Sequence, residues 1–218
     1  MQQLQIDLVS DVACPWCAIG YKRLERAMAE LEPELNVQIR WRPFQLNPDM
    51  PPEGEPILEH LTRKYGRSPE EMHAAQEQII GFAEELGLNF SGARDRRAYN
   101  TFDAHRLLAW AAEAGRQTEL AMRLFDAYFG HGLDTSDHAV LAETAESAGL
   151  PVGEARAVLD SDRFADEVRT EERHYKQSGV TGVPAFVVNG QYMIAGAQDP
   201  DTLVLALRQV AGKVAAAE

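Results

Sequence analysis

Hydrophobic and polar residues alternate in two stretches near the start of the chain, which is typical of β-strands. The first stretch covers residues 4–9 and the second covers residues 36–42. Between them, from residue 24 to residue 31, hydrophobic residues recur at the three- and four-residue spacing of a helix that buries one face. The opening of the chain therefore predicts a β-α-β unit.

The middle of the chain shows helical spacing almost throughout, from residue 57 to residue 178. It is entered through residues 43–56, whose five prolines exclude a helix interior or a central strand. The clearest helix start is Ser68-Pro69-Glu70-Glu71, with a capping serine, a proline at the first helical position and an acid three residues after the cap. Further helices are predicted near residues 100–114, 120–130, 137–148, 153–160 and 162–177.

Strand patterns return near the end of the chain. Residues 184–188 and 191–195 are separated by Asn189-Gly190, the strongest short signal for a hairpin turn. A last helix is predicted from Asp199 to about Val210. The order of elements is therefore β-α-β, then a helical segment, then β-β-α.

The two cysteines of the chain lie in Cys14-Pro15-Trp16-Cys17, where the first strand passes into the first helix. A thiolate is the nucleophile that attacks disulfides, and the unpaired N–H groups and positive dipole end of a helix N-terminus stabilise it there. Cys17 follows three residues later on the same helical face, so it can reach back to resolve a mixed disulfide. This arrangement predicts a thioredoxin-type redox dithiol.

Packing and metal binding are the other roles that two close cysteines can have. Free cysteine is often buried as a small hydrophobic residue. Structural zinc takes four ligands, whereas this chain has no second Cys-x-x-Cys and no pair of histidines at metal-binding spacing. The strand-to-helix position favours the redox role, and we expect no metal site.

The order of elements and the dithiol together predict an α/β protein with a thioredoxin-like fold. A large all-helical insertion separates its β-α-β and β-β-α halves. We expect a discontinuous thioredoxin-like domain from residues 1–50 and 179–218, and an inserted helical domain from residues 51–178.

Charge and hydrophobicity limit the partners and the cellular environment that can be expected for the protein. The 218 residues carry a net charge of −13, which argues against binding nucleic acid or anionic membranes. No apolar stretch approaches the roughly 18 residues that span a bilayer. The N-terminus shows no secretory signal, so a cytoplasmic location is expected.

Gly182-Val183-Pro184, directly before a predicted strand, forms the second motif. In thioredoxin-like proteins a proline at this place is cis and faces the dithiol. Pro184 is therefore predicted to be cis, and the backbone of Val183 is predicted to pair with an extended substrate that carries a thiol or disulfide.

The chain resembles the FrnE-like branch of the DsbA family of thioredoxin-fold oxidoreductases over nearly its whole length. The resemblance implies thiol–disulfide exchange with protein or small-molecule substrates, without a metal or a bound prosthetic group. It implies that Cys14 is the nucleophile, Cys17 the resolving thiol and Pro184 the cis-proline. The similar blocks are residues 10–20, 41–48, 100–107, 182–186 and 194–198.

Two other functions stay open at this point. Related by fold are the kappa-class glutathione transferases and the 2-hydroxychromene-2-carboxylate isomerases, which carry a serine in place of Cys14 and use bound glutathione. The complete dithiol argues against this chemistry, although glutathione as a co-substrate stays open. A non-enzymatic, chaperone-like binding protein is the third hypothesis. A homodimer through the helical segment is also left open.

Five further residues bear on the site. Trp16, between the cysteines, is equally suited to contact a substrate or to pack on the helical segment. Asn100 and Thr101 are placed to cap the helix that follows, and the resemblance suggests that they face the catalytic groove. His105 is either a proton carrier or a hydrogen-bonded structural histidine. Asp11 opposes a nearby thiolate unless it caps backbone N–H groups.

Overall fold

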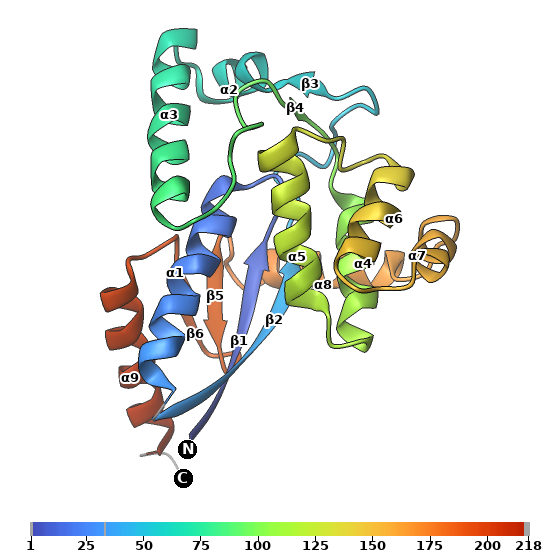
Figure 1. Cartoon of the computed structure of the whole chain (residues 1–218). Helices are drawn as coiled ribbons and strands as arrows, with labels where there is room; N and C mark the ends of the chain where they lie inside the picture. The colour runs from blue at the N-terminus through green and yellow to red at the C-terminus, as the bar shows by residue number, and fades with distance from the viewer. Residues whose placement is uncertain (1, 33, 216–218) are drawn as a thin grey trace.

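A four-stranded mixed sheet with the strand order β2-β1-β5-β6 forms the centre of the molecule (Figure 1). The computed structural model describes residues 2–32 and 34–215. β2 pairs parallel with β1, whereas β5 pairs antiparallel with both β1 and β6. The first and last parts of the chain therefore share one sheet, as predicted. The strands are β1 (Gln2–Ser10), β2 (Leu35–Pro43), β5 (Ala185–Val188) and β6 (Tyr192–Ala195).

Helices cover both faces of this sheet. Because successive side chains of a strand point to opposite faces, Leu4, Ile6 and Leu8 of β1 share one face, and all three are buried in the main core. This core also holds residues of α1 (Pro15–Leu31) and α9 (Pro200–Ala215). Val9 belongs to a smaller cluster on the other face, together with Tyr175 of α8 (Ala165–Gln177).

The segment between β2 and β5 is helical, as predicted, with three local departures, two of which concern strands and the start of a helix. A two-residue ladder joins β3 (Glu55–Pro56) to β4 (Arg97–Ala98), and strands this short carry no periodicity by which a sequence could reveal them. α8 begins later than predicted, at Ala165, because Phe164 has a left-handed backbone with φ of 62°. The other helices are α2 (Ile57–Tyr65), α3 (Pro69–Glu85), α4 (Phe102–Glu113), α5 (Gln117–Phe125), α6 (His138–Ser147) and α7 (Val152–Leu159).

A π-helical turn, η1 (Asp126–Gly130), directly continues α5. π-helical turns inside helices are rare and often occur at functional sites. The hydrophobic spacing predicts an ordinary helix over residues 120–130, because a single π-turn changes that spacing little.

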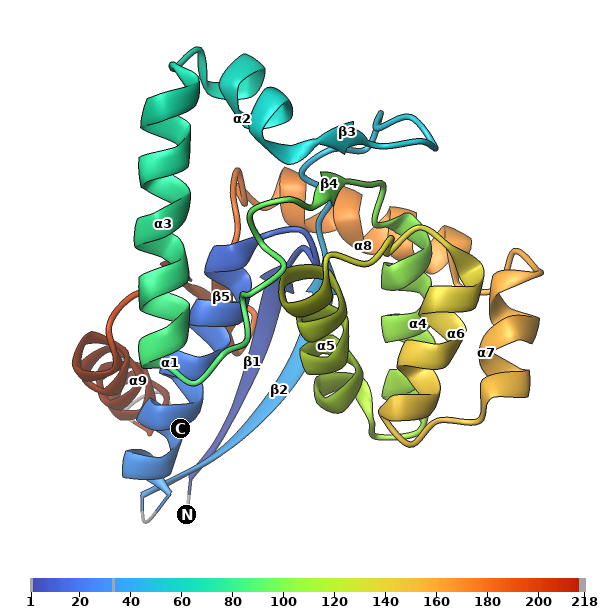
Figure 2. The ribbon, with the colours of Figure 1, turned by 45° about the horizontal axis from the view of Figure 1, so that its top comes forward.

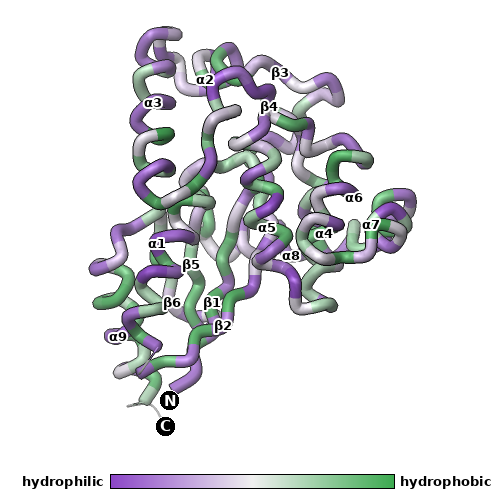
Figure 3. Tube along the Cα trace, in the orientation of Figure 1, coloured by the Kyte–Doolittle hydropathy of each residue, from purple (hydrophilic) through white to green (hydrophobic). Residues whose placement is uncertain are grey.

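α3 lies beside α1, and α2 lies near the start of α3 (Figures 1 and 2). Hydrophobic and hydrophilic positions alternate along α3, as expected for a helix with one covered face (Figure 3). Its start has the predicted capping box: the Ser68 hydroxyl accepts from the N–H of Glu71, and the Glu71 carboxylate accepts from the N–H of Ser68. Within the described residues, none of the helices has the length and apolar content needed to cross a bilayer.

A buried acid, Asp7, links β1 to β2 on the face that α8 covers. Its carboxylate accepts hydrogen bonds from Arg40 at 2.8 Å and from Arg42 at 3.1 Å. Burial opposes ionisation, but the two guanidinium groups outweigh it and lower the pKa of Asp7.

We expect an Asp7→Asn variant to be less stable at pH 7 by about 1–3 kcal/mol, because hydrogen bonds to a charged group are lost. Because the pKa of Asp7 is lower in the folded than in the unfolded protein, its ionised carboxylate stabilises the fold above the unfolded pKa of about 3.9. This contribution is lost as the pH falls through the pKa of Asp7 in the folded protein. The difference in the free energy of unfolding between Asp7→Asn and the unchanged protein should therefore shrink below about pH 4. Urea unfolding followed by circular dichroism at several pH values measures it, and a difference independent of pH would contradict this assignment.

Candidate active site

The dithiol lies where β1 turns into α1. Cys14 occupies the position before the first helical residue and has an extended backbone, with φ of −94° and ψ of 112°. Its N–H donates to the carbonyl of Asp11 at 3.0 Å, and the N–H of Cys17 donates to the carbonyl of Cys14 at 3.0 Å. Pro15 has no N–H to leave unpaired. The sequence thus places the Cys14 sulfur at the positive end of the α1 dipole.

The loop before β5 faces this sulfur. The bond between Val183 and Pro184 is cis, as predicted. The Cys14 Sγ lies 3.6 Å from the carbonyl oxygen of Val183, with which the thiol hydrogen-bonds. A methyl group on Gly20 would lie 3.0 Å from the Pro184 ring, so the absence of a side chain allows α1 to approach this loop closely.

Asp11 ties together the turn that carries Cys14. Its carboxylate accepts from the N–H of Ala13 at 3.2 Å and from the N–H of Leu46 at 2.7 Å. His105 lies behind Asp11: its Nε2 is 3.6 Å from the carboxylate and 3.2 Å from the carbonyl oxygen of Phe44. Among the described residues no hydrogen bond joins His105 to either cysteine, so the geometry favours the structural alternative over a proton carrier.

Asn100 and Thr101 lie at the start of α4. The Asn100 side-chain oxygen accepts from the N–H of Phe102 at 2.8 Å, and its amide donates to the carbonyl of Pro48 at 2.8 Å. Thr101 is buried and its side chain makes no capping hydrogen bond. Asn100 therefore caps the helix and holds the loop after β2, and neither residue lines the cavity beside Cys14.

The two thiols differ in their surroundings. Cys14 is only 4% exposed but lines a cavity, whereas Cys17 is fully buried and lines none of the cavity beside Cys14. Burial raises the pKa of the Cys17 thiol well above its usual range, and the neighbouring Cys14 adds to this effect.

We expect iodoacetamide at pH 7 to alkylate Cys14 well before Cys17, because alkylation requires an accessible thiolate. Peptide mass spectrometry after timed quenching measures the two rates. In urea the unfolded chain should react at both cysteines, which serves as the control. Equal labelling of both residues in the folded protein would contradict the assigned difference.

A cavity of about 530 Å³ opens beside Cys14, between the start of α1 and the helices α2 and α3. Trp16 lines it and also packs against Phe82 of α3, with ring centroids 5.9 Å apart. Trp16 thus packs on the helical segment, which is one of the two predicted alternatives, and it also lines the cavity.

Several polar residues that line this cavity were not predicted from the sequence, and they include Gln76, Arg96 and Tyr128. Arg96 follows a stretch of loop without periodicity, and Tyr128 lies in η1, so neither carried a signal in the sequence. No group of three or more His, Cys, Asp or Glu side chains in residues 2–32 and 34–215 is arranged to hold a metal ion.

Comparison with known proteins places this geometry in a family. The chain is 38% identical to a probable DsbA oxidoreductase from Streptomyces coelicolor, whose crystal structure superimposes with a TM-score of 0.87 over 96% of this chain and 90% of that one. Two structures share the fold at lower identity. One is a 2-hydroxychromene-2-carboxylate isomerase, with 16% identity and a TM-score of 0.66 over 98% of this chain and 99% of the other. The other is the cytosolic disulfide reductase DsbM from Pseudomonas aeruginosa with GSH, with 18% identity and a TM-score of 0.61 over 95% and 98%.

The family model of the DSBA-like thioredoxin domain matches residues 5–208, which is nearly the whole chain. Together with the dithiol, the facing cis-proline and the helical insertion, this match shows that the chain belongs to the DSBA-like thioredoxin domain family.

Proposed function

We propose that the protein is a thiol–disulfide oxidoreductase that works through Cys14 and Cys17. The observation that carries this proposal is the position of the Cys14 sulfur at the start of α1, 3.6 Å from the Val183 carbonyl, with the buried Cys17 one helical turn behind it. Membership of the DSBA-like family supports the same reaction class.

The reaction follows from these positions. The Cys14 thiolate attacks one sulfur of a substrate disulfide, which forms a mixed disulfide and releases the other substrate sulfur as a thiolate. Cys17 then loses its proton and attacks the Cys14 sulfur, which forms the Cys14–Cys17 disulfide and releases the second substrate thiolate. Two electrons pass from the protein to the substrate, and the reverse sequence oxidises a substrate dithiol.

Substrate positioning is assigned to the loop before β5. In this proposal the Val183 backbone pairs with an extended segment of the substrate. The ring of Pro184 forms the surface beside the reacting sulfurs. The FrnE-like branch and a cytoplasmic location are parts of the same proposal; the similarity to a cytosolic disulfide reductase supports the location.

Equilibration in glutathione buffers of graded potential tests the reaction. Thiol trapping measures the fraction of the protein whose two cysteines are reduced. A Cys14→Ser variant is the control. A reversible two-electron transition is the expected result. A midpoint well above the cytosolic glutathione poise of about −220 to −320 mV indicates an oxidant or isomerase, and one at or below it indicates a reductase.

A glutathione-dependent transferase or isomerase is the second candidate, because a large cavity adjoins Cys14 and the fold is shared with an isomerase. This candidate predicts saturable binding of glutathione without formation of an intramolecular disulfide. It also predicts an activity that survives the loss of Cys17.

A further inference from the structure

Three polar groups without partners line the cavity beside Cys14. Arg96 Nε, Gln76 Nε2 and the Tyr128 hydroxyl are buried, and none has a hydrogen-bond partner among the described residues. Arg96 and Gln76 are each only 7% exposed, and Tyr128 is 1% exposed. Buried polar groups in proteins are nearly always paired, so three unpaired groups at one cavity indicate a missing ligand.

The charged side chains that line the cavity indicate the sign of the ligand's charge. Among the described residues, Lys64, Arg67 and Arg96 are the cationic side chains that line it, and no Asp or Glu does, although the chain as a whole carries a net charge of −13. The Arg96 guanidinium donates to a backbone carbonyl, and it makes no ion pair with a carboxylate in the described part of the chain. A buried guanidinium without a counter-ion is costly, and an anionic ligand removes that cost.

The wall that carries Arg96 is held rigidly in place. The Arg96 guanidinium donates to the carbonyl of Ala93 and lies over the Tyr128 ring, 5.2 Å from its centroid. The loop before Arg96 packs tightly on the residues after η1, since a methyl group on Gly92 would come within 2.6 Å of the N of Gly132. Donors fixed in this way need little reordering when a ligand binds.

We infer that the cavity beside Cys14 binds a small disulfide or thiol that bears a carboxylate, with Arg96, Tyr128 and Gln76 holding the carboxylate and its sulfur directed to Cys14. This inference rests on the proposed function. One cation and two neutral donors suit a single negative charge. The low exposure of Arg96 favours a small molecule over a folded protein substrate.

The rest of the lining suits the hydrocarbon link between carboxylate and sulfur, because much of it is apolar. Apolar side chains from α3 and η1 line the cavity, and they include Met72, Ile80 and Phe129. A ligand that carries its charge at one end and its sulfur at the other therefore matches both the polar wall and the apolar lining.

Single-turnover oxidation of the reduced protein tests this inference with a matched pair of disulfides, dithiodipropionate and its uncharged bis-amide. Each rate constant is divided by the rate of the same disulfide with free mercaptoethanol, which removes the difference in intrinsic reactivity. The reaction consumes one disulfide and yields the Cys14–Cys17 disulfide and two small thiols. We expect the acid to react about tenfold or more faster than the amide, in keeping with hydrogen bonds to a charged group.

Variants identify the residues that give the preference for the acid over the amide. Arg96→Met should lower the acid-to-amide ratio by about tenfold, and Tyr128→Phe should lower it less, because a neutral donor is lost. The ratio is measured only for variants whose circular dichroism spectrum matches that of the unchanged protein, because unfolded chains would react with both disulfides and lower the ratio. Arg94→Met is the matched control, since Arg94 pairs with Glu77 on the surface at 2.6 Å and does not line the cavity. This control should keep the ratio of the unchanged protein.

The outcomes separate this inference from the proposed function. If both disulfides react equally well in the unchanged protein, the carboxylate site is refuted while the oxidoreductase stands. If neither reacts, the carboxylate site is refuted as well, and the equilibration in glutathione buffers decides separately whether the oxidoreductase stands. Competition identifies the anion: inhibition by propionate supports the inference, whereas inhibition by inorganic phosphate alone overturns it in favour of a phosphate-bearing ligand.

Discussion

A Cys14→Ser variant is expected to lose thiol–disulfide exchange completely, down to the rate of the uncatalysed reaction. A serine hydroxyl is not ionised near neutral pH and does not attack a disulfide sulfur. The fold should survive, because serine is a favoured residue at the start of a helix and Cys14 makes no side-chain capping hydrogen bond of its own. Reduction of an insulin-type protein disulfide, followed by turbidity, measures the activity.

Replacement of Cys17 separates the two steps of the reaction. In Cys17→Ser the attack by Cys14 remains, but the mixed disulfide is no longer resolved from within the protein. Intact-mass spectrometry should therefore show a stable adduct of one substrate thiol on Cys14. Exchange activity in Cys14→Ser with an unchanged unfolding midpoint would refute the assignment of the nucleophile.

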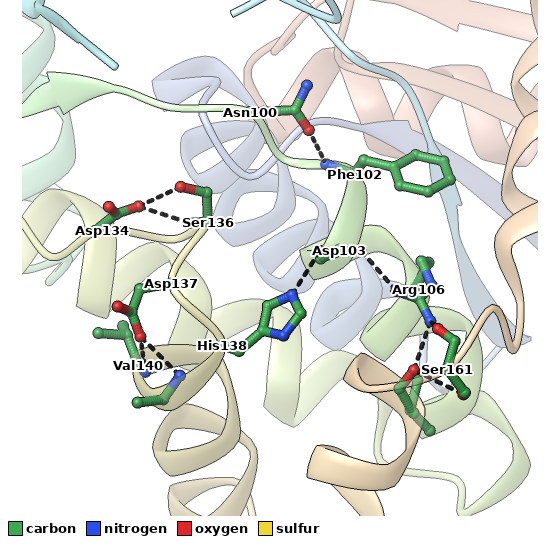
Figure 4. A network of polar contacts seen from close by, with 12 residues as sticks. Asn100, Phe102, Asp103, Arg106, Asp134, Ser136, Asp137, His138, Val140 and Ser161 are labelled. Carbon is green, nitrogen blue, oxygen red and sulfur yellow. Dashed lines mark hydrogen bonds and ion pairs between the residues drawn. The ribbon is translucent and has the colours of Figure 1, made fainter. Parts of the chain in front are cut away.

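An Arg106→Met variant is expected to lose about 3–5 kcal/mol of the free energy of unfolding. Arg106 of α4 is buried and donates to the backbone carbonyls of Val158, Ser161 and Arg163 at the connection between α7 and α8. It also pairs with Asp103 at 2.7 Å, as Figure 4 shows. Methionine fills similar space but removes the guanidinium donor from all three carbonyls, of which, among the described residues, only that of Val158 keeps another donor, from Ser161.

Urea unfolding followed by circular dichroism measures this loss. Arg173→Met is the control, because Arg173 is exposed on α8 and donates only to the Thr170 hydroxyl among the described residues. A change within about 0.5 kcal/mol is expected for it. If the two variants lost equal stability, the buried network around Arg106 would not be the cause.

The sequence was informative where local patterns decide the structure. The alternation in β1 and β2, the capping box at Ser68 and the Asn189-Gly190 turn each depend on neighbouring residues, and each prediction is confirmed. The dithiol at a strand-to-helix junction and the cis bond before Pro184 are also present. These features position the reacting sulfurs, so the core of the candidate site could be predicted.

Contacts between distant segments were not accessible in the same way. The link from the Asp11 carboxylate to the N–H of Leu46 depends on how the loop after β2 returns to the dithiol. The meeting of Arg96 with Tyr128 depends on the packing of a loop against η1. Side chains of this kind have ordinary local surroundings in the sequence, and only the tertiary fold gives them partners.

The division of the sheet between the two ends of the chain has a consequence for synthesis. While the protein emerges from the ribosome, β1 can pair with β2, but its other neighbour, β5, is made only after the whole helical segment. Until β5 has been made, the dithiol of the nascent chain therefore lacks the Val183 carbonyl and the Pro184 ring beside it. Translation itself delays assembly of the reactive centre until the segment that carries Val183, Pro184 and β5 has been made.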